Sequence, residues 1–160
     1  MTGSSSTGWR PRAVTTTSRE LTTGSAAETE AAAEYFARHL RRGDLLLLAG
    51  PLGAGKTTFV RGLARGLGVA GAVQSPTFQL LRVHAGAPAL AHVDVYRLEA
   101  APELADLGLE DHLEAGVVVV EWGDRLDGLP ATRRGKIEIE QLDPESRRLQ
   151  IVEGPAEWSW

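Results

Sequence analysis

Residues 50–57 read Gly-Pro-Leu-Gly-Ala-Gly-Lys-Thr, and this stretch decides the fold because it matches the spacing G-x-x-x-x-G-K-[ST]. Small residues let a backbone wrap around a phosphate so that successive N–H groups point inward. The stretch leads into a predicted helix, whose first turn attracts anions. In such loops the lysine contacts the terminal phosphates and the hydroxyl binds Mg²⁺. We therefore predict these roles for Lys56 and Thr57.

Both flanks of this loop have the periodicity that such a site requires. Asp44–Ala49 contains four consecutive leucines, which is typical of a strand buried on both faces. Lys56–Leu67 has apolar residues at helical spacing and ends at Gly68. Gly62 and Gly66 inside this helix indicate either close packing against the sheet or a weaker helix. Strand, loop and helix agree, which argues against a chance glycine turn.

Two acidic residues at predicted strand ends are candidates to hold a metal ion or a water molecule. Glu121 follows the apolar run Val117–Val120, at the carboxyl end of a buried strand, where open α/β sheets place their ligands. Asp94 also lies at a strand end. The alternatives are a surface carboxylate for Glu121 and an ion pair with a neighbour such as Arg97 for Asp94.

The rest of the chain predicts one domain over residues 19–154, between a disordered tail at 1–18 and a C-terminal tail at 155–160. The first tail is rich in Ser, Thr and Gly and buries too little to offset its ordering entropy. Ser25 and Glu28 form a capping box that predicts a helix ending before Gly43. Further strands are predicted at Arg19–Thr23, Gln79–Val83, Leu90–Tyr96, Lys136–Leu142 and Arg147–Val152, and short helical segments at Pro102 and Glu110–Glu114.

Composition restricts the possible functions. The chain has 160 residues, a formal net charge of −4 and no cysteine, which excludes disulfides, cysteine–zinc sites and thiol catalysis. No apolar run is long enough to span a membrane, and no secretory signal is recognisable. The acidic balance argues against a broad nucleic-acid-binding face, DNA included. We expect a cytoplasmic protein.

Four separated blocks resemble a known family. They are GAGKTTF at residues 53–59, SPTF at 75–78, HVDVYRL at 92–98 and EW at 121–122. Together they resemble TsaE, formerly YjeE, the small bacterial ATPase of tRNA threonylcarbamoyladenosine (t6A) synthesis, over about residues 20–152. The loop is common to many families, whereas the ordered set of the other three blocks is much more specific.

The resemblance implies a P-loop NTPase-like three-layer α/β fold whose mixed sheet has a parallel core and antiparallel edges. It implies binding of ATP and Mg²⁺, and ATP hydrolysis that is slow alone and faster with the partner proteins TsaD and TsaB. Those partners place the threonylcarbamoyl group on adenosine 37 of tRNA, so tRNA is contacted indirectly through the complex. The ATPase is expected to reset that machinery.

Carried over by resemblance, the family's functional residues fall on several positions of this chain. Thr77 is implied to sense the γ-phosphate, although Pro76 alone could explain a strand-start threonine there. Arg147 and Thr23–Ala27 are implied to lie near the adenine, with an exposed hairpin arginine as the alternative. The implied catalytic residues are Lys56, Asp94 and Glu121; the implied nucleotide contacts are Gly53, Ala54, Gly55, Lys56, Thr57, Thr58, Thr77 and Arg147; the implied metal ligands are Thr57 and Glu121.

One departure and three alternatives accompany this prediction. Pro51 stands where the family usually has an acidic residue. A proline removes one backbone donor but leaves the phosphate-cradling amides that follow.

A small-molecule kinase would need an arginine lid, for which Arg133, Arg134 and Lys136 are the available cluster. A regulatory GTPase is disfavoured, because the chain contains no asparagine for an N-K-x-D motif. A non-hydrolysing, nucleotide-dependent scaffold is the third alternative.

Overall fold

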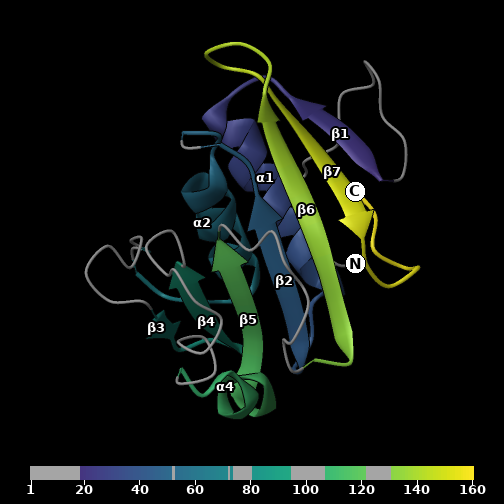
Figure 1. Cartoon of the computed structure of the whole chain (residues 1–160). Helices are drawn as coiled ribbons and strands as arrows, with labels where there is room; N and C mark the ends of the chain where they lie inside the picture. The colour runs from purple at the N-terminus through teal and green to yellow at the C-terminus, as the bar shows by residue number, and fades with distance from the viewer. Residues whose placement is uncertain (1–18, 52, 72, 74–80, 95–106, 122–130) are drawn as a thin grey trace, which may run out of the picture.

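A computed structural model of the chain describes residues 19–51, 53–71, 73, 81–94, 107–121 and 131–160. Within these ranges the chain forms one sheet with helices packed against it (Figure 1). The strands are β1 (Glu20–Thr23), β2 (Asp44–Ala49), β3 (Leu81–His84), β4 (Ala89–Asp94), β5 (Gly116–Glu121), β6 (Arg133–Gln141) and β7 (Arg147–Glu153). The helices are α1 (Ala26–Phe36), the 3-10 turn η1 (Ala37–His39), α2 (Lys56–Gly66) and α4 (Leu109–Ala115).

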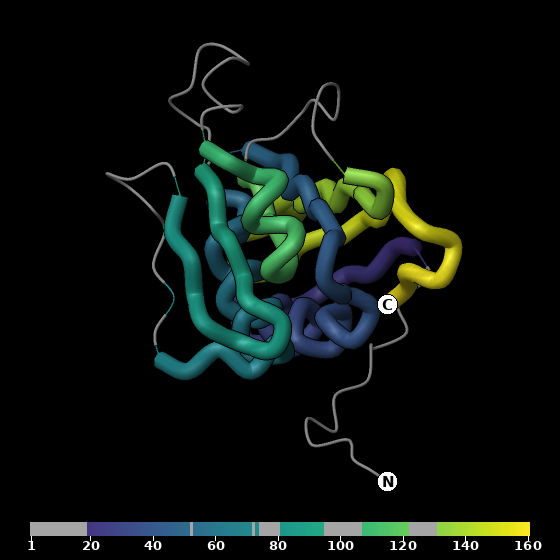
Figure 2. Tube along the Cα trace, turned by 90° about the horizontal axis from the view of Figure 1, so that it is seen from below, coloured from purple at the N-terminus to yellow at the C-terminus, as the bar shows by residue number. Residues whose placement is uncertain are grey.

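The sheet is mixed, and its strands follow the order β1-β7-β6-β2-β5-β4-β3. Strand β2 runs parallel to both β5 and β6, and β5 runs parallel to β4. The pairs β1–β7, β6–β7 and β3–β4 are antiparallel. Figure 2 shows the teal β3–β4 hairpin at one side of the molecule and the yellow C-terminal region at the other. The predicted parallel core with antiparallel edges is confirmed.

Alternate residues of β2 face two separate hydrophobic cores. Leu46 and Leu48 pack with residues of α1 and α2 on one face of the sheet. Leu45 and Leu47 pack on the opposite face with residues of α4. Every residue of β2 is buried, as a continuous apolar run in a doubly covered strand requires. Helices on both faces give the three layers that the resemblance implied.

The predicted element boundaries are close to the observed ones. Ser25 caps α1, and its Oγ accepts a hydrogen bond from the backbone N–H of Glu28 at 3.1 Å. The Glu28 carboxylate reaches back to the N–H of Gly24 at 2.7 Å, one residue earlier than in a standard capping box. Strand β6 begins at Arg133, earlier than predicted. The helical segment predicted at Glu110–Glu114 is present as α4, while the one at Pro102 lies outside the described residues.

Helices α1 and α2 are in contact through their backbones. The contact depends on Gly62 and Gly66, one helical turn apart on α2. A β-carbon on Gly66 would lie 2.5 Å from the carbonyl oxygen of Glu34, and one on Gly62 would lie 2.7 Å from the β-carbon of Ala33. These glycines therefore allow α2 to approach α1. Of the two predicted alternatives, close packing is present, but the partner is α1 and not the sheet.

Replacing Gly62 by alanine is expected to lower the free energy of unfolding by roughly 1–3 kcal/mol, the usual cost of overpacking. The sign is diagnostic, because at an unconstrained helix position the same change stabilises a protein by about 1 kcal/mol. Urea unfolding measures the difference. Gly24→Ala is the control, because its β-carbon would meet the flexible Glu28 side chain at 3.4 Å. A Gly62→Ala protein more stable than the wild type would contradict the close helix contact.

Residues 155–160, predicted as a tail, pack against the folded domain. Trp158 is fully buried, and its ring lies edge-on to Phe36 with the ring centroids 5.3 Å apart. Two glycines make room for the indole. A β-carbon on Gly154 would lie 2.7 Å from Trp158 Cε3, and one on Gly135 of β6 would also collide with the ring. The segment is thus part of the hydrophobic core in the structure.

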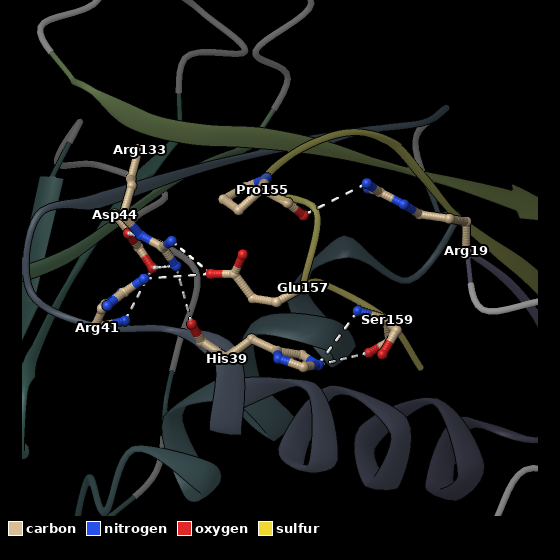
Figure 3. Close-up of polar contacts among 8 residues, drawn as sticks. All are labelled: Arg19, His39, Arg41, Asp44, Arg133, Pro155, Glu157 and Ser159. Atoms are coloured by element: carbon tan, nitrogen blue, oxygen red, sulfur yellow. Dashed lines mark hydrogen bonds and ion pairs between the residues drawn. The ribbon is translucent and has the colours of Figure 1, made fainter.

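Ion pairs hold the same segment against the start of β2 and β6 (Figure 3). Glu157 accepts hydrogen bonds from Arg133 at 2.6 Å and from Arg41 at 3.3 Å. Arg133 also donates at 2.7 Å to Asp44, which is fully buried. The hydrogen bond from Arg133 lowers the pKa of the Glu157 carboxyl group. Further contacts in Figure 3 join Ser159 to His39 and Arg19 to Pro155.

Candidate functional site

The glycine loop joins the carboxyl end of β2 to the first turn of α2. Gly53 and Gly55 have φ angles of 82° and 106°, a backbone region that side chains strongly disfavour. Helix α2 begins at Lys56, directly after the loop, as predicted. The glycines thus let the chain turn sharply into the helix, with the helix N-terminus at the loop. This is the arrangement that concentrates N–H groups on an anion.

The Lys56 side chain is folded back over the loop. Its ammonium group donates hydrogen bonds to the carbonyl oxygens of Gly50 at 2.7 Å and Pro51 at 2.9 Å. The residue is only 4% exposed, and these carbonyls compensate the charge that burial would otherwise make costly. Pro51 also accepts from the N–H of Ala54 at 3.0 Å. Pro51, which departs from the family pattern, therefore stabilises the loop by accepting two hydrogen bonds at its carbonyl oxygen.

The two candidate carboxylates meet at the carboxyl ends of neighbouring parallel strands. Asp94 ends β4 and Glu121 ends β5, and their α-carbons are partners in the register. Strand β5 in turn lies next to β2, whose end leads into the loop. Glu121 is 3% exposed, whereas Asp94 is half-buried. The structure therefore brings both predicted acidic residues to the edge of the sheet from which the loop starts.

Sequence reasoning missed a contact to Glu121. Its carboxylate Oε2 is hydrogen-bonded to Nε2 of His92, which is fully buried. Side chains two residues apart on a strand share a face. Leu90 and Val119, two residues before His92 and Glu121, belong to the core cluster beneath α1 and α2. His92 and Glu121 therefore point to the face of the sheet on which α2 lies. In the sequence, His92 stands two residues before Asp94 in the block HVDVYRL. This spacing places both side chains on one face of the strand.

Arg147 reaches the glycine loop from the start of β7. Its Nε donates to the carbonyl oxygen of Ala54 at 2.8 Å. Its Nη1 donates to carbonyl oxygens of the preceding turn, including those of Asp143 and Ser146, each at 3.0 Å. The Asp143 carboxylate organises this turn by accepting from the Ser146 N–H at 2.7 Å, which lowers its pKa. The guanidinium is thus held between the turn and the loop, not left as an exposed hairpin arginine.

The N-terminal strand–helix junction meets the same region. Thr23, the last residue of β1, is the register partner of Arg147. Its hydroxyl is buried and lies 2.6 Å from that of Thr29 in α1. The structure therefore brings Thr23 close to the loop through Arg147, and a place for both residues near the adenine stays a prediction. Thr77, Tyr96, Arg97 and Trp122 lie outside the described residues.

These features define a class of protein. A buried strand, a glycine loop with a Lys-Thr pair, a helix that starts at the loop and an acidic residue ending the adjacent parallel strand are together typical of P-loop nucleotide-binding α/β proteins. Among the helices that the structure describes, none is long and apolar enough to cross a membrane.

Comparison with known proteins identifies the family within this class. The family model described as "Threonylcarbamoyl adenosine biosynthesis protein TsaE" matches residues 23–149. The chain belongs to the TsaE family of tRNA t6A biosynthesis proteins, and membership in this family implies nucleotide binding.

Individual relatives agree with this assignment. The tRNA threonylcarbamoyladenosine biosynthesis protein TsaE of Streptomyces coelicolor is 49% identical over 120 residues, which cover 72% of this chain and 73% of the relative. The corresponding Bacillus subtilis protein is 40% identical over 127 residues, or 78% and 79% of the two chains. The crystal structure of Bacillus subtilis YdiB is similar with a TM-score of 0.70 and 31% identity, covering 87% of each chain.

Proposed function

We propose that this protein binds ATP with Mg²⁺ and hydrolyses it, and that hydrolysis drives cycling of the TsaB–TsaD transferase. The observation that carries the proposal is the position of Lys56 in a glycine loop one strand away from Glu121. Family membership supports a role in t6A synthesis. TsaB and TsaD would be the direct partners, tRNA would be contacted through them, and the complex would act in the cytoplasm.

The residues present suit a magnesium ion. Mg²⁺ prefers oxygen ligands, and the candidates are the hydroxyl of Thr57 in the first turn of α2 and the carboxylate of Glu121. Glu121 is buried, and a nearby cation would compensate a carboxylate charge that burial makes costly. When bound, the ion neutralises charge on the phosphate oxygens.

The proposed reaction is an in-line displacement by water at the γ-phosphorus. A new bond forms between the water oxygen and phosphorus, and the bond to the β-γ bridging oxygen breaks, which leaves ADP and phosphate. Lys56 exchanges its bonds to loop carbonyls for phosphate oxygens and stabilises the developing charge. Asp94 and Glu121, adjacent in the register, are the two candidates to orient the water. Thr58 and Thr77 are proposed as further nucleotide contacts.

The test is ATP hydrolysis by the purified chain with Mg²⁺, measured alone and with TsaB and TsaD from the same organism. Strong stimulation by the two partners, lost in Lys56→Ala, is the expected result. Stable ATP binding with no turnover in the presence of both partners would instead identify a nucleotide-dependent scaffold. Competition by GTP as strong as that by ATP would favour the GTPase alternative.

One of the three residues in the candidate lid of the kinase alternative, Arg133, lies away from the glycine loop. Arg133 lies at the start of β6, paired in register with Asp44 at the start of β2, whereas the glycine loop follows the end of β2. Its guanidinium is bound to Asp44 and Glu157. An arginine held at that end of the strands does not serve as a lid over the phosphates.

Arg147→Ala is expected to weaken ATP binding by roughly 10- to 150-fold, because a hydrogen bond from a charged group contributes about 1.5–3 kcal/mol and this one fixes the loop at Ala54. Isothermal titration calorimetry measures the change. Arg148→Ala is the matched control, since that side chain pairs with Glu20 and Glu140 instead. Equal ATP affinity in the two variants would exclude a specific role for Arg147.

A further inference from the structure

His92 makes one side-chain hydrogen bond among the described residues. It is fully buried on an apolar face of β4, and its Nε2 is hydrogen-bonded to Oε2 of Glu121. Its other nitrogen, Nδ1, has no hydrogen-bond partner among the described residues. A buried imidazole is costly unless it is hydrogen-bonded, and an aliphatic side chain would otherwise fill the same space. The contact with Glu121 is therefore the reason we assign for a histidine at this position.

The contact restricts the Glu121 carboxylate. Glu121 has three rotatable side-chain bonds, and a free carboxylate at a strand end would sample several directions. A hydrogen bond to Oε2 fixes the last of these rotations and thereby the direction of the second oxygen, Oε1. In the register, His92 pairs with Val119, two residues before Glu121. His92 therefore reaches Glu121 diagonally across the two strands from within the core.

We propose that His92 is a positioning residue for Glu121. Its Nε2 hydrogen bond holds Oε2, and Oε1 is left to serve Mg²⁺ or the attacking water. This inference rests on the proposed ATPase function and adds to it a residue that acts only through Glu121. Groups that hold a metal-binding carboxylate from behind typically change metal affinity or activity about 10–100-fold when they are removed.

Three substitutions at the same position separate the hydrogen bond from core packing. His92→Gln carries an amide N–H at nearly the reach of Nε2, His92→Asn carries one that ends too short, and His92→Leu carries none. The measurements are the Mg²⁺ concentration that gives half-maximal tightening of ATP binding, by calorimetry, and the dependence of hydrolysis on Mg²⁺ with TsaB and TsaD present. Binding provides a readout that does not require turnover.

We expect the Leu and Asn variants to need roughly 10–100 times more Mg²⁺ and to hydrolyse ATP correspondingly more slowly. The Gln variant should stay within a few-fold of the wild type, and ATP binding without Mg²⁺ should be unchanged in all three. Leu90→Ala, buried on the same face of β4, is the control for lost packing. It should lower thermal stability without changing the Mg²⁺ requirement.

Different results would contradict the ATPase function and the role of His92. A wild-type protein that neither binds nor hydrolyses ATP with Mg²⁺ would overturn the proposed function itself. A competent wild type with a normal Mg²⁺ requirement in His92→Leu would overturn only the role of His92. Equal impairment of the Gln and Leu variants, with the same loss of thermal stability, would show that the histidine is merely structural.

Discussion

Replacing Lys56 by alanine is expected to reduce ATP turnover at least about 100-fold, the usual loss when one preorganised donor to developing charge is removed. The ammonium group is held in the loop by the carbonyl oxygens of Gly50 and Pro51, and it is proposed to exchange these bonds for phosphate oxygens when nucleotide binds. Without it, the carbonyl oxygens of Gly50 and Pro51 lose this donor and the phosphates lose their cation. Steady-state hydrolysis in the presence of TsaB and TsaD measures the effect.

The chain provides a matched control for this substitution. Lys136 is the only other lysine in the sequence, and it lies on β6, where it forms an ion pair with Glu138 at 3.8 Å. Lys136→Ala should retain near-normal turnover. That result would show that losing one positive charge elsewhere in the protein does not abolish ATP hydrolysis. If Lys56→Ala hydrolyses ATP like Lys136→Ala, the glycine loop is not the catalytic site.

The second large effect is on stability. Trp158→Ala is expected to lower the free energy of unfolding by roughly 3–5 kcal/mol, as large-to-small substitutions of buried aromatic residues do. The indole is fully buried, contacts Phe36 and fills the space that Gly135 and Gly154 leave open. Removing it leaves a cavity between β6 and α1 that neither glycine can fill. Equilibrium urea unfolding, followed by circular dichroism, measures the loss.

A substitution on the surface of a neighbouring strand checks the specificity of that result. Val152 is 37% exposed on β7, and Val152→Ala should cost little. A small effect of Trp158→Ala would mean that residues 155–160 are attached only loosely and form the tail that the sequence predicted. A large effect would also show that the ion pairs of Glu157 with Arg133 and Arg41 cannot hold the segment alone.

The central part of the fold was predictable because its signals are local. The four leucines of β2, the glycine loop and the periodicity of α2 are contiguous, and each segment determines its own conformation. The capping of α1 by Ser25 is equally local. Glu121 and Asp94 could be placed at strand ends from their sequence neighbours, and parallel pairing then brought them together.

The remaining features depend on contacts between distant segments. Gly62 and Gly66 were visible in the sequence, but nothing in it shows that their neighbour is α1 and not the sheet. Trp158 stands in a short segment without periodicity, and its pocket is formed by glycines of other segments. His92 is one residue of a strand pattern, and its partner comes from the next strand. Sequence periodicity indicates which face a residue occupies, not what it meets there.

The backbone contact between α1 and α2 has a mechanical consequence. Gly62 and Gly66 have no side chains to hold the helices apart. Arg65 of α2 is hydrogen-bonded to Glu30 and Glu34 of α1. The two helices therefore cannot slide past each other without separating. This closely packed helix pair begins at the glycine loop, through α2, and at the β1–α1 turn, through α1.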